Sequence, residues 1–74
     1  MVFQTIEFKK ENKVARVTLN RPDAFNALSP QLLGDLRVAF KEVRNDLEIK
    51  ALVITGKGKA FCAGADLKSL HGFF

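Results

Sequence analysis

Ala51-Leu52-Val53-Ile54-Thr55 decides the fold of this 74-residue chain, because it is an uninterrupted apolar run between polar segments. Such a run is typical of a strand covered on both faces in a parallel sheet. A glycine- and lysine-containing loop over residues 56–59 follows it, and then Phe61-Cys62-Ala63-Gly64-Ala65-Asp66. Small side chains there would let a ligand approach the backbone, and the start of a helix leaves N–H groups without partners. The sequence therefore predicts a strand, a loop and a helix start able to hold an anion or an oxyanion.

Upstream, two stretches alternate apolar and polar residues as half-buried strands do. Residues 5–8 place Ile6 and Phe8 on one face, and residues 14–19 place three apolar residues on one face: Ala15, Val17 and Leu19. Residues 9–13 are polar and are expected to form the turn, with Asn12 in a left-handed conformation. The pattern predicts a β-hairpin.

The central segment predicts one amphipathic helix. Pro22 is expected to end the second strand, and Ser29 and Pro30 fit the cap and the first position of a helix that runs to Asn45 or Asp46. Apolar residues spaced by three and four form a stripe that would cover the sheet: Leu33, Leu36, Phe40, Val43 and Leu47, broadened by Leu32 and Ala39. Strand, helix and strand together predict a right-handed βαβ crossover, hence an α/β fold.

Composition limits the classes of protein. A chain of 74 residues is at most one small domain, and such a chain buries only about 60% of its unfolded surface. The net charge is +4, but no aromatic platform or arginine-rich run accompanies it, so nucleic acid is not an expected partner. Cys62 is the single cysteine, which excludes an internal disulfide. The first residues lack a signal-peptide pattern and no apolar run approaches the roughly 20 residues of a membrane span, so we expect a cytoplasmic protein without membrane contact.

Two elements resemble a known family. Asn20-Arg21-Pro22-Asp23-Ala24-Phe25-Asn26-Ala27-Leu28 resembles the NRPxxxNAL element of the crotonase superfamily, the enoyl-CoA hydratase/isomerase family. Residues 51–70, ALVITGKGKAFCAGADLKSL, are similar to the strand, loop and AGAD element of that family. The resemblance covers about Phe3 to Leu70. It implies that residues 1–74 are the N-terminal portion of a crotonase-like (ClpP/crotonase) domain several times this length.

The resemblance also implies a substrate and a site. Crotonase-family enzymes bind acyl-CoA thioesters and polarise the thioester carbonyl with two backbone N–H groups. The third residue of the family's AGA run supplies one donor, so Ala65 N–H is the expected catalytic group. The residues expected to contact coenzyme A are Asp23, Ala24, Phe25, Ala63, Gly64, Ala65, Asp66, Leu67 and Lys68. Relatives often carry a basic residue where Asp23 stands, and an acid that pointed inward there would repel the phosphates.

The same residues also have simpler interpretations. Residues 63–65 can serve only a tight strand-to-helix turn, and the Asp66 side chain can cap the next helix. Asn26 is expected to hold its own loop by side-chain hydrogen bonds. Cys62 has no activating base nearby in the sequence, so we expect a buried structural thiol, and one histidine with one cysteine predicts no metal site. Three lysines could either reach phosphate groups or remain in solvent: Lys57, Lys59 and Lys68.

Several parts of a crotonase-like enzyme have no counterpart here. Family hydratases take their catalytic carboxylates, their second oxyanion donor and much of their trimer contact from later elements. The glutamates of this chain do not match the catalytic positions: Glu7, Glu11, Glu42 and Glu48. We expect no turnover from residues 1–74 alone and no cofactor beyond the coenzyme A of the substrate. The whole enzyme, a trimer or hexamer, would hydrate a 2-enoyl-CoA by default.

Other functions remain open from the sequence. An isomerase, a dehydratase or a hydrolase would share the same N-terminal elements, because later residues set the reaction. The chain could instead be a non-catalytic module that binds coenzyme A, or a truncated interaction protein that self-associates through exposed apolar surface.

Overall fold

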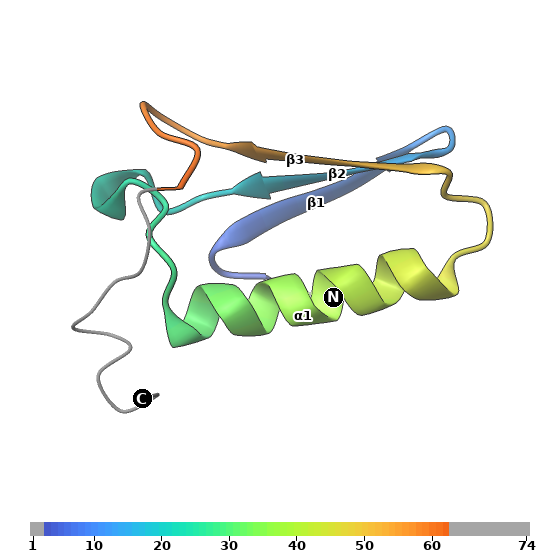
Figure 1. The fold of residues 1–74 in the computed structure, drawn as a ribbon, viewed down its shortest axis with the longest axis horizontal. Helices are drawn as coiled ribbons and strands as arrows, with labels where there is room; N and C mark the ends of the chain where they lie inside the picture. The colour runs from blue at the N-terminus through green and yellow to red at the C-terminus, as the bar shows by residue number, and fades with distance from the viewer. Residues whose placement is uncertain (1–2, 63–74) are drawn as a thin grey trace.

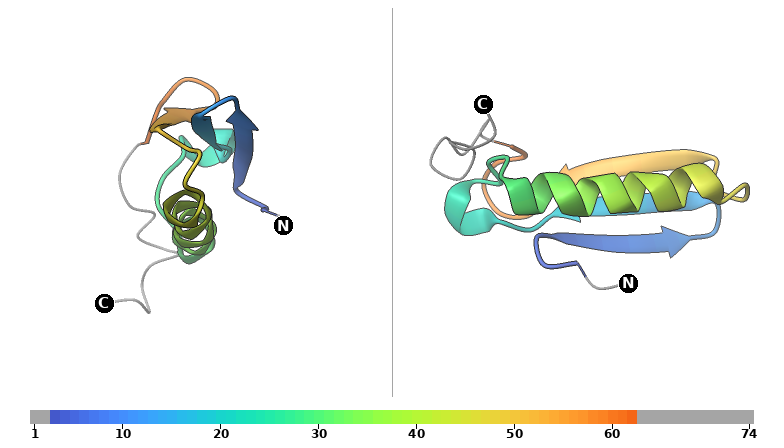
Figure 2. Two further views of the ribbon diagram at one scale, coloured as in Figure 1. Left: turned by 90° about the vertical axis from the view of Figure 1, so that its right-hand side faces the viewer. Right: turned by 90° about the horizontal axis from the view of Figure 1, so that it is seen from below.

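The computed structural model describes residues 3–62, in which a three-stranded sheet packs one face against a single helix (Figure 1). The elements in chain order are β1 (Ile6–Glu11), β2 (Val14–Leu19), the 3-10 turn η1 (Pro22–Ala24), α1 (Pro30–Asn45) and β3 (Ala51–Gly56). The sheet order is β1-β2-β3, with β1 antiparallel and β3 parallel to the central β2. The β2–α1–β3 connection is right-handed when followed through the end view (Figure 2). The predicted α/β architecture, a hairpin followed by a βαβ unit, is confirmed.

The hairpin differs from the prediction in the length of its turn. Residues 9–11 continue β1 and pair with β2, so the expected five-residue turn is only Asn12-Lys13. Asn12 has a φ of 56°, and the left-handed conformation predicted for it is confirmed. Asparagine tolerates this conformation better than most residues, so a turn of two residues can close the hairpin directly after Glu11.

One of these strand lysines also fastens the hairpin to the chain between α1 and β3. Lys10 Nζ lies 2.9 Å from a carboxylate oxygen of Asp46 and 2.8 Å from one of Glu48. Hydrogen bonds from Lys10 lower the pKa of Asp46, and those to Glu48 and Asp46 raise the pKa of Lys10. The pairs are solvent-accessible, so they specify where the loop sits more than they stabilise it.

The helix begins where the sequence predicts. Ser29 Oγ accepts a hydrogen bond from Leu32 N at 3.2 Å, and Pro30 occupies the first turn. The helix ends at Asn45, within the predicted boundary. Pro22 does not border β2, which ends at Leu19; it opens the 3-10 turn instead. Within residues 3–62, no helix is long and apolar enough to cross a membrane.

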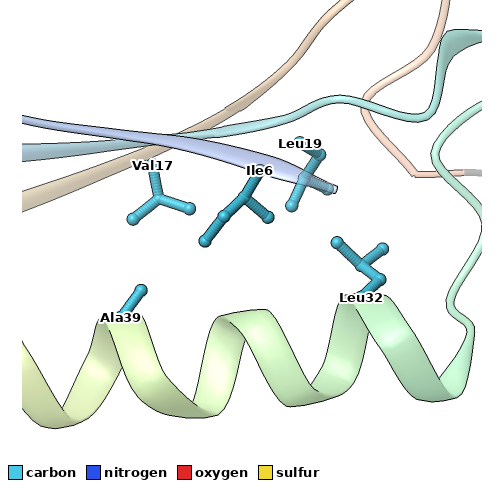
Figure 3. Packing of buried hydrophobic residues seen from close by; sticks show 5 residues of the cluster. All are labelled: Ile6, Val17, Leu19, Leu32 and Ala39. Carbon is cyan, nitrogen blue, oxygen red and sulfur yellow. The ribbon is translucent and has the colours of Figure 1, made fainter. Parts of the chain in front are cut away.

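A small apolar core fills the space between sheet and helix (Figure 3). Its buried members come from β1, β2 and α1: Ile6, Val17, Leu19, Leu32 and Ala39. The strand faces are as predicted, but the helix stripe is rotated from the predicted one. Phe40 is 39% exposed, and Leu47, which lies beyond the helix, is 86% exposed. Leu32 and Ala39, which were expected only to broaden the stripe, are its buried members together with Asp35, and Leu36 packs against the core from a half-buried position.

Asp35 explains this rotation, because its carboxylate finds partners inside. Its Oδ2 accepts hydrogen bonds from Thr5 N at 2.8 Å, Thr5 Oγ1 at 2.7 Å and Gln4 N at 3.1 Å. Burial acts to raise the pKa of Asp35, but the hydrogen bonds from Thr5 and Gln4 outweigh it and hold that pKa below its usual value. A buried charge is tolerated when such bonds satisfy it. The network joins the start of β1 to the middle of α1.

The third strand is the part of the fold that the described residues cover least. Leu52, Val53 and Ile54 are 39%, 37% and 39% exposed, so the expected covering of both faces is not found within residues 3–62. Among the residues that the structure describes, β3 pairs only with β2 and is therefore an edge strand of the sheet (Figure 2). An apolar strand that is exposed on both faces and unpaired along one edge favours association with further chain.

Asp35→Asn tests the charged network without changing its shape. In the complete domain we expect the free energy of unfolding at pH 7 to fall by about 1.5–3 kcal/mol, the range for a hydrogen bond to a charged group. The folded-state pKa is lowered, so this stabilisation exists above the unfolded pKa of about 3.9 and is lost as pH falls through the folded value. Urea unfolding at pH 7 and pH 3 should show a difference between variant and wild type that shrinks in acid; a constant difference would contradict this assignment.

The uncovered strand predicts the solution behaviour of residues 1–74 alone. With a core of few residues and an apolar edge strand, we expect the isolated chain to be oligomeric, aggregated or partly folded in dilute solution. Sedimentation velocity and urea unfolding of the purified chain measure this. A monodisperse monomer with one cooperative transition would instead identify a self-sufficient small domain.

Candidate functional site

Two loops meet at the carboxyl ends of the parallel strands. Residues 20–29 follow β2 and residues 57–62 follow β3, and both loops lie at the same end of the sheet (Figure 1). Lys57 N donates a hydrogen bond to Leu19 O at 2.8 Å, which extends the pairing of the strands into the second loop. In open α/β sheets, ligands bind outside this end of the strands. The two loops are therefore the candidate site.

Asn26 fastens the first loop to the second. Its side chain is fully buried, and its Nδ2 donates to Lys57 O at 3.0 Å and to Ala60 O at 2.7 Å. Its Oδ1 accepts from Arg21 N at 2.7 Å, and its own N donates to Arg21 O at 2.8 Å. One side chain thus closes its own loop and holds two carbonyl groups that lie more than thirty residues later in the chain.

Two glycines let the second loop pack this closely. A Cβ on Gly56 would stand 2.6 Å from Phe61 O and 2.7 Å from Ala60 O, so any side chain would displace the backbone of the loop. Gly58 has a φ of 92°, and a Cβ there would lie 3.1 Å from Pro22 Cβ. Glycine is the residue that tolerates both a left-handed conformation and a close backbone approach. The loop is therefore folded back over the end of β3 and against the first loop.

The first loop presents an aromatic side chain to solvent. Phe25 is 54% exposed and has a φ of 52°, and Asn26 has a φ of 57°. A left-handed conformation is unfavourable for a bulky residue, by about 1–3 kcal/mol where the surroundings impose it. Hydrogen bonds impose it here, because Phe25 N donates to Pro22 O at 3.1 Å and the Arg21 guanidinium donates to Ala27 O. An exposed aromatic ring held in a strained turn is a candidate ligand contact.

The predicted site residues fall into two groups. Three of them share the first loop: Asp23 and Phe25 are exposed, and Ala24 is half-buried. The other six lie outside the described residues: Ala63, Gly64, Ala65, Asp66, Leu67 and Lys68. Cys62 is half-buried and packs against the core, in keeping with a structural thiol.

Several charged side chains of the described segment are engaged in ion pairs. Lys57 Nζ, in the second loop, lies 2.9 Å from Glu7 Oε2. At the opposite end of the sheet, beside the hairpin turn, Glu11 pairs with Lys9 at 3.0 Å. A hydrogen bond from Lys9 lowers the pKa of Glu11. Lys59 is exposed. Among residues 3–62, no three histidine, cysteine or carboxylate side chains gather as they would around a metal ion.

Two structural residues were underestimated from the sequence. Asn26 was expected to hold only its own loop, whereas it also binds the loop after β3. The Asp35 network was missed, although an acid at helical spacing between Leu32 and Ala39 is a usable signal that a polar group faces inward. The partners that the sequence did not indicate, Lys57 and Ala60 for Asn26 and Thr5 for Asp35, are at least 30 residues away in the chain, so local patterns do not identify them.

Comparison with known proteins gives consistent matches. The chain matches the family model described as enoyl-CoA hydratase/isomerase over residues 9–72. It is 43% identical over 70 residues to a probable enoyl-CoA hydratase of Mycobacterium bovis, covering 95% of this chain and 27% of that protein. It is 42% identical over 71 residues to a short-chain-enoyl-CoA hydratase of Clostridium acetobutylicum, again with 95% and 27% covered.

Solved structures agree with this match. A crystal structure of an enoyl-CoA hydratase/isomerase from Mycobacterium paratuberculosis superposes with a TM-score of 0.84 at 52% identity, covering 86% of this chain and 25% of that one. One of a probable enoyl-CoA hydratase/isomerase from Mycobacterium abscessus gives 0.90 at 32% identity, covering 96% and 28%. The chain thus spans about a quarter of the length of these relatives. The sequence match and the shared fold together show that this chain belongs to the enoyl-CoA hydratase/isomerase family.

Proposed function

We propose that this chain is the N-terminal part of an acyl-CoA enzyme, most simply a 2-enoyl-CoA hydratase, and that it supplies one oxyanion donor and part of the coenzyme A surface. The observation that carries the proposal is the joining of the two loops by Asn26 at the carboxyl ends of β2 and β3. Relatives with the same fold are named enoyl-CoA hydratases. Their names support the substrate class.

The oxyanion donor in this proposal is the N–H of Ala65. The second loop leads directly into residues 63–66, and Gly56, Gly58 and Asn26 fix the backbone from which that segment continues. A backbone N–H needs no particular side chain, but the site needs small ones so that the thioester can come close. The run of alanine and glycine at 63–65 meets this requirement.

Coenzyme A would lie along the first loop. Phe25 offers an exposed apolar surface in a fixed conformation, and Ala24 offers a backbone that a ligand can approach. Lys59 and Lys68 are candidates for the phosphate groups, whereas Lys57 already pairs with Glu7. The exposed Asp23 can point into solvent, which would avoid repelling a phosphate. Coenzyme A enters as part of the substrate, and no further cofactor is needed.

In hydration, water adds across the double bond conjugated to the thioester. The water oxygen bonds to C3 while a base takes its proton, the electrons of the double bond move onto the carbonyl oxygen, and C2 then receives a proton. The Ala65 N–H would stabilise the negative charge on that oxygen, and such a donor contributes about 3–4 kcal/mol elsewhere. The proton transfers need carboxylates at the reacting carbons.

The glutamates of the described segment are poor candidates for that acid–base work. Glu7 and Glu11 pair with Lys57 and Lys9, and Glu48 pairs with Lys10. Glu42 is exposed on α1. We therefore assign the proton transfers, the second oxyanion donor and the contacts of a homo-oligomer to other parts of the full-length protein.

Replacing Ala65 by proline in the full-length protein tests the donor. Proline has no N–H, so we expect kcat for a short 2-enoyl-CoA to fall by about 100-fold or more, as it does when one oxyanion-hole donor is removed elsewhere. The assay follows loss of the absorbance of the conjugated thioester. Because proline also perturbs the backbone, circular dichroism must show that the variant is folded.

Ala65→Gly is the matched control, since it keeps the N–H and a small side chain; its kcat should stay near that of the wild type. Residues 1–74 alone should show no turnover above background. A folded Ala65→Pro variant with normal kcat would refute the assignment of the Ala65 N–H as oxyanion donor. Turnover by the isolated chain that depends on one of its own glutamates would refute the assignment of the proton transfers to other parts of the full-length protein.

A further inference from the structure

We infer that Asn26 is a positioning residue for the proposed site: its side-chain amide sets the path of the 57–62 loop, from which the chain continues to the proposed donor at Ala65. The inference rests on the proposed function and deepens it. It assigns to Asn26 a task beyond closing its own loop, and one that the sequence alone did not indicate.

The geometry that carries this inference is the direction of the two donated hydrogen bonds. Both go from Nδ2 to carbonyl groups of the other loop, at 3.0 Å for Lys57 and 2.7 Å for Ala60. Two bonds to residues three apart fix the orientation of the segment between them as well as its distance. The second carbonyl belongs to a residue only five positions before Ala65.

The rest of the side chain makes the anchor rigid. The Oδ1 is held by Arg21 N at 2.7 Å, and the Asn26 N–H by Arg21 O at 2.8 Å, so the amide cannot rotate without breaking a bond. Asn26 is fully buried, which removes water as a replacement partner for these groups. A buried donor or acceptor that loses its partner costs the full free energy of its desolvation. The position of the second loop is therefore coupled to the first.

The close packing at Gly56 makes the loop sensitive to this anchor. The carbonyl oxygens of Phe61 and Ala60 lie only 2.6 and 2.7 Å from where a Cβ on Gly56 would stand, so the loop packs closely against the end of β3. The pairing of Lys57 N with Leu19 O holds the beginning of the loop independently of Asn26. Loss of the amide would therefore release the later part of the loop, which precedes Ala65 in the sequence, more than its start.

Asn26→Gly in the full-length protein is the main test. Glycine keeps the left-handed backbone conformation of Asn26 without strain but removes all the side-chain bonds. We expect kcat for a 2-enoyl-CoA to fall by about 10- to 100-fold, the effect of a reacting group misplaced by about 1 Å, while KM changes little. The carbonyl stretch of a bound, isotope-labelled acyl-CoA should move back toward its frequency in water, because the donor no longer polarises it.

Asp35→Asn is the control for a loss of stability alone, since it weakens a different buried network. It should lower the unfolding free energy but leave kcat and the carbonyl stretch of the folded protein unchanged. If Asn26→Gly does not fold, Asn26→Asp provides the same comparison: it keeps the acceptor for Arg21 N and removes the donation to Lys57 O and Ala60 O. If both variants unfold, the loss of all function would show only a folding role and would overturn the inference.

The outcomes separate the inference from the proposed function. If a folded Asn26 variant keeps normal kcat and a normal carbonyl stretch while Ala65→Pro is inactive, the donor stands and Asn26 is not a positioning residue. If Ala65→Pro is fully active, the proposed function fails whatever Asn26 does. If kcat falls equally in Asp35→Asn, the fall in the Asn26 variants reflects a general loss of stability, and the inference is overturned.

Discussion

The hydrogen bonds from the Asn26 amide to the carbonyls of Lys57 and Ala60 hold together the two loops at the carboxyl ends of β2 and β3. Parallel strands bring these loops to the same end of the sheet, but the strands do not fix the position of one loop relative to the other. The hydrogen bonds of the amide fix it, and the glycines at 56 and 58 allow the close approach that these bonds require. Chemistry that depends on a backbone N–H needs such a fixed path, because the donor has no side chain with which to adjust its position.

The remainder of the described fold supports the end of the sheet that carries the two loops. α1 connects β2 to β3 and packs against β1 and β2, while the register of β3 is given by its parallel ladder with β2. The apolar core between them is small, and the buried network of Asp35 with Thr5 adds a directional contact between the helix and β1. β3 remains exposed within residues 3–62, which accords with a chain that spans about a quarter of the length of its relatives.

Local patterns predicted most of the elements. The alternation in residues 14–19 and the cap at Ser29 follow from interactions within a few residues, and both are confirmed. The end of β1 was predicted wrongly, because residues 9–11 were assigned to the turn, and Asp35 was not among the inward-facing residues predicted for α1. Lys10 remains in the strand, where it reaches two acids near α1, and Asp35 faces inward because Thr5 binds it. Such partners are set by the tertiary fold, not by spacing.

The site divides in the same way. The asparagine of the first loop and the glycines of the second stand in motifs that can be read from the sequence, but the bonds between the loops cannot. From the sequence, Asn26 was expected to hold only its own loop, whereas in the structure its side chain binds both loops. The exposed, left-handed Phe25 likewise results from the hydrogen bonds around it and not from any preference of phenylalanine for that conformation.

The most direct measurement is a crystal structure of the full-length protein with an unreactive acyl-CoA bound. We expect the thioester oxygen at about 2.7–3.1 Å from the Ala65 nitrogen, as in an oxyanion hole, with the Asn26 amide still bonded to the carbonyls of Lys57 and Ala60. A thioester bound away from the Ala65 N–H, or a second loop in the same position with the Asn26 bonds broken, would contradict it.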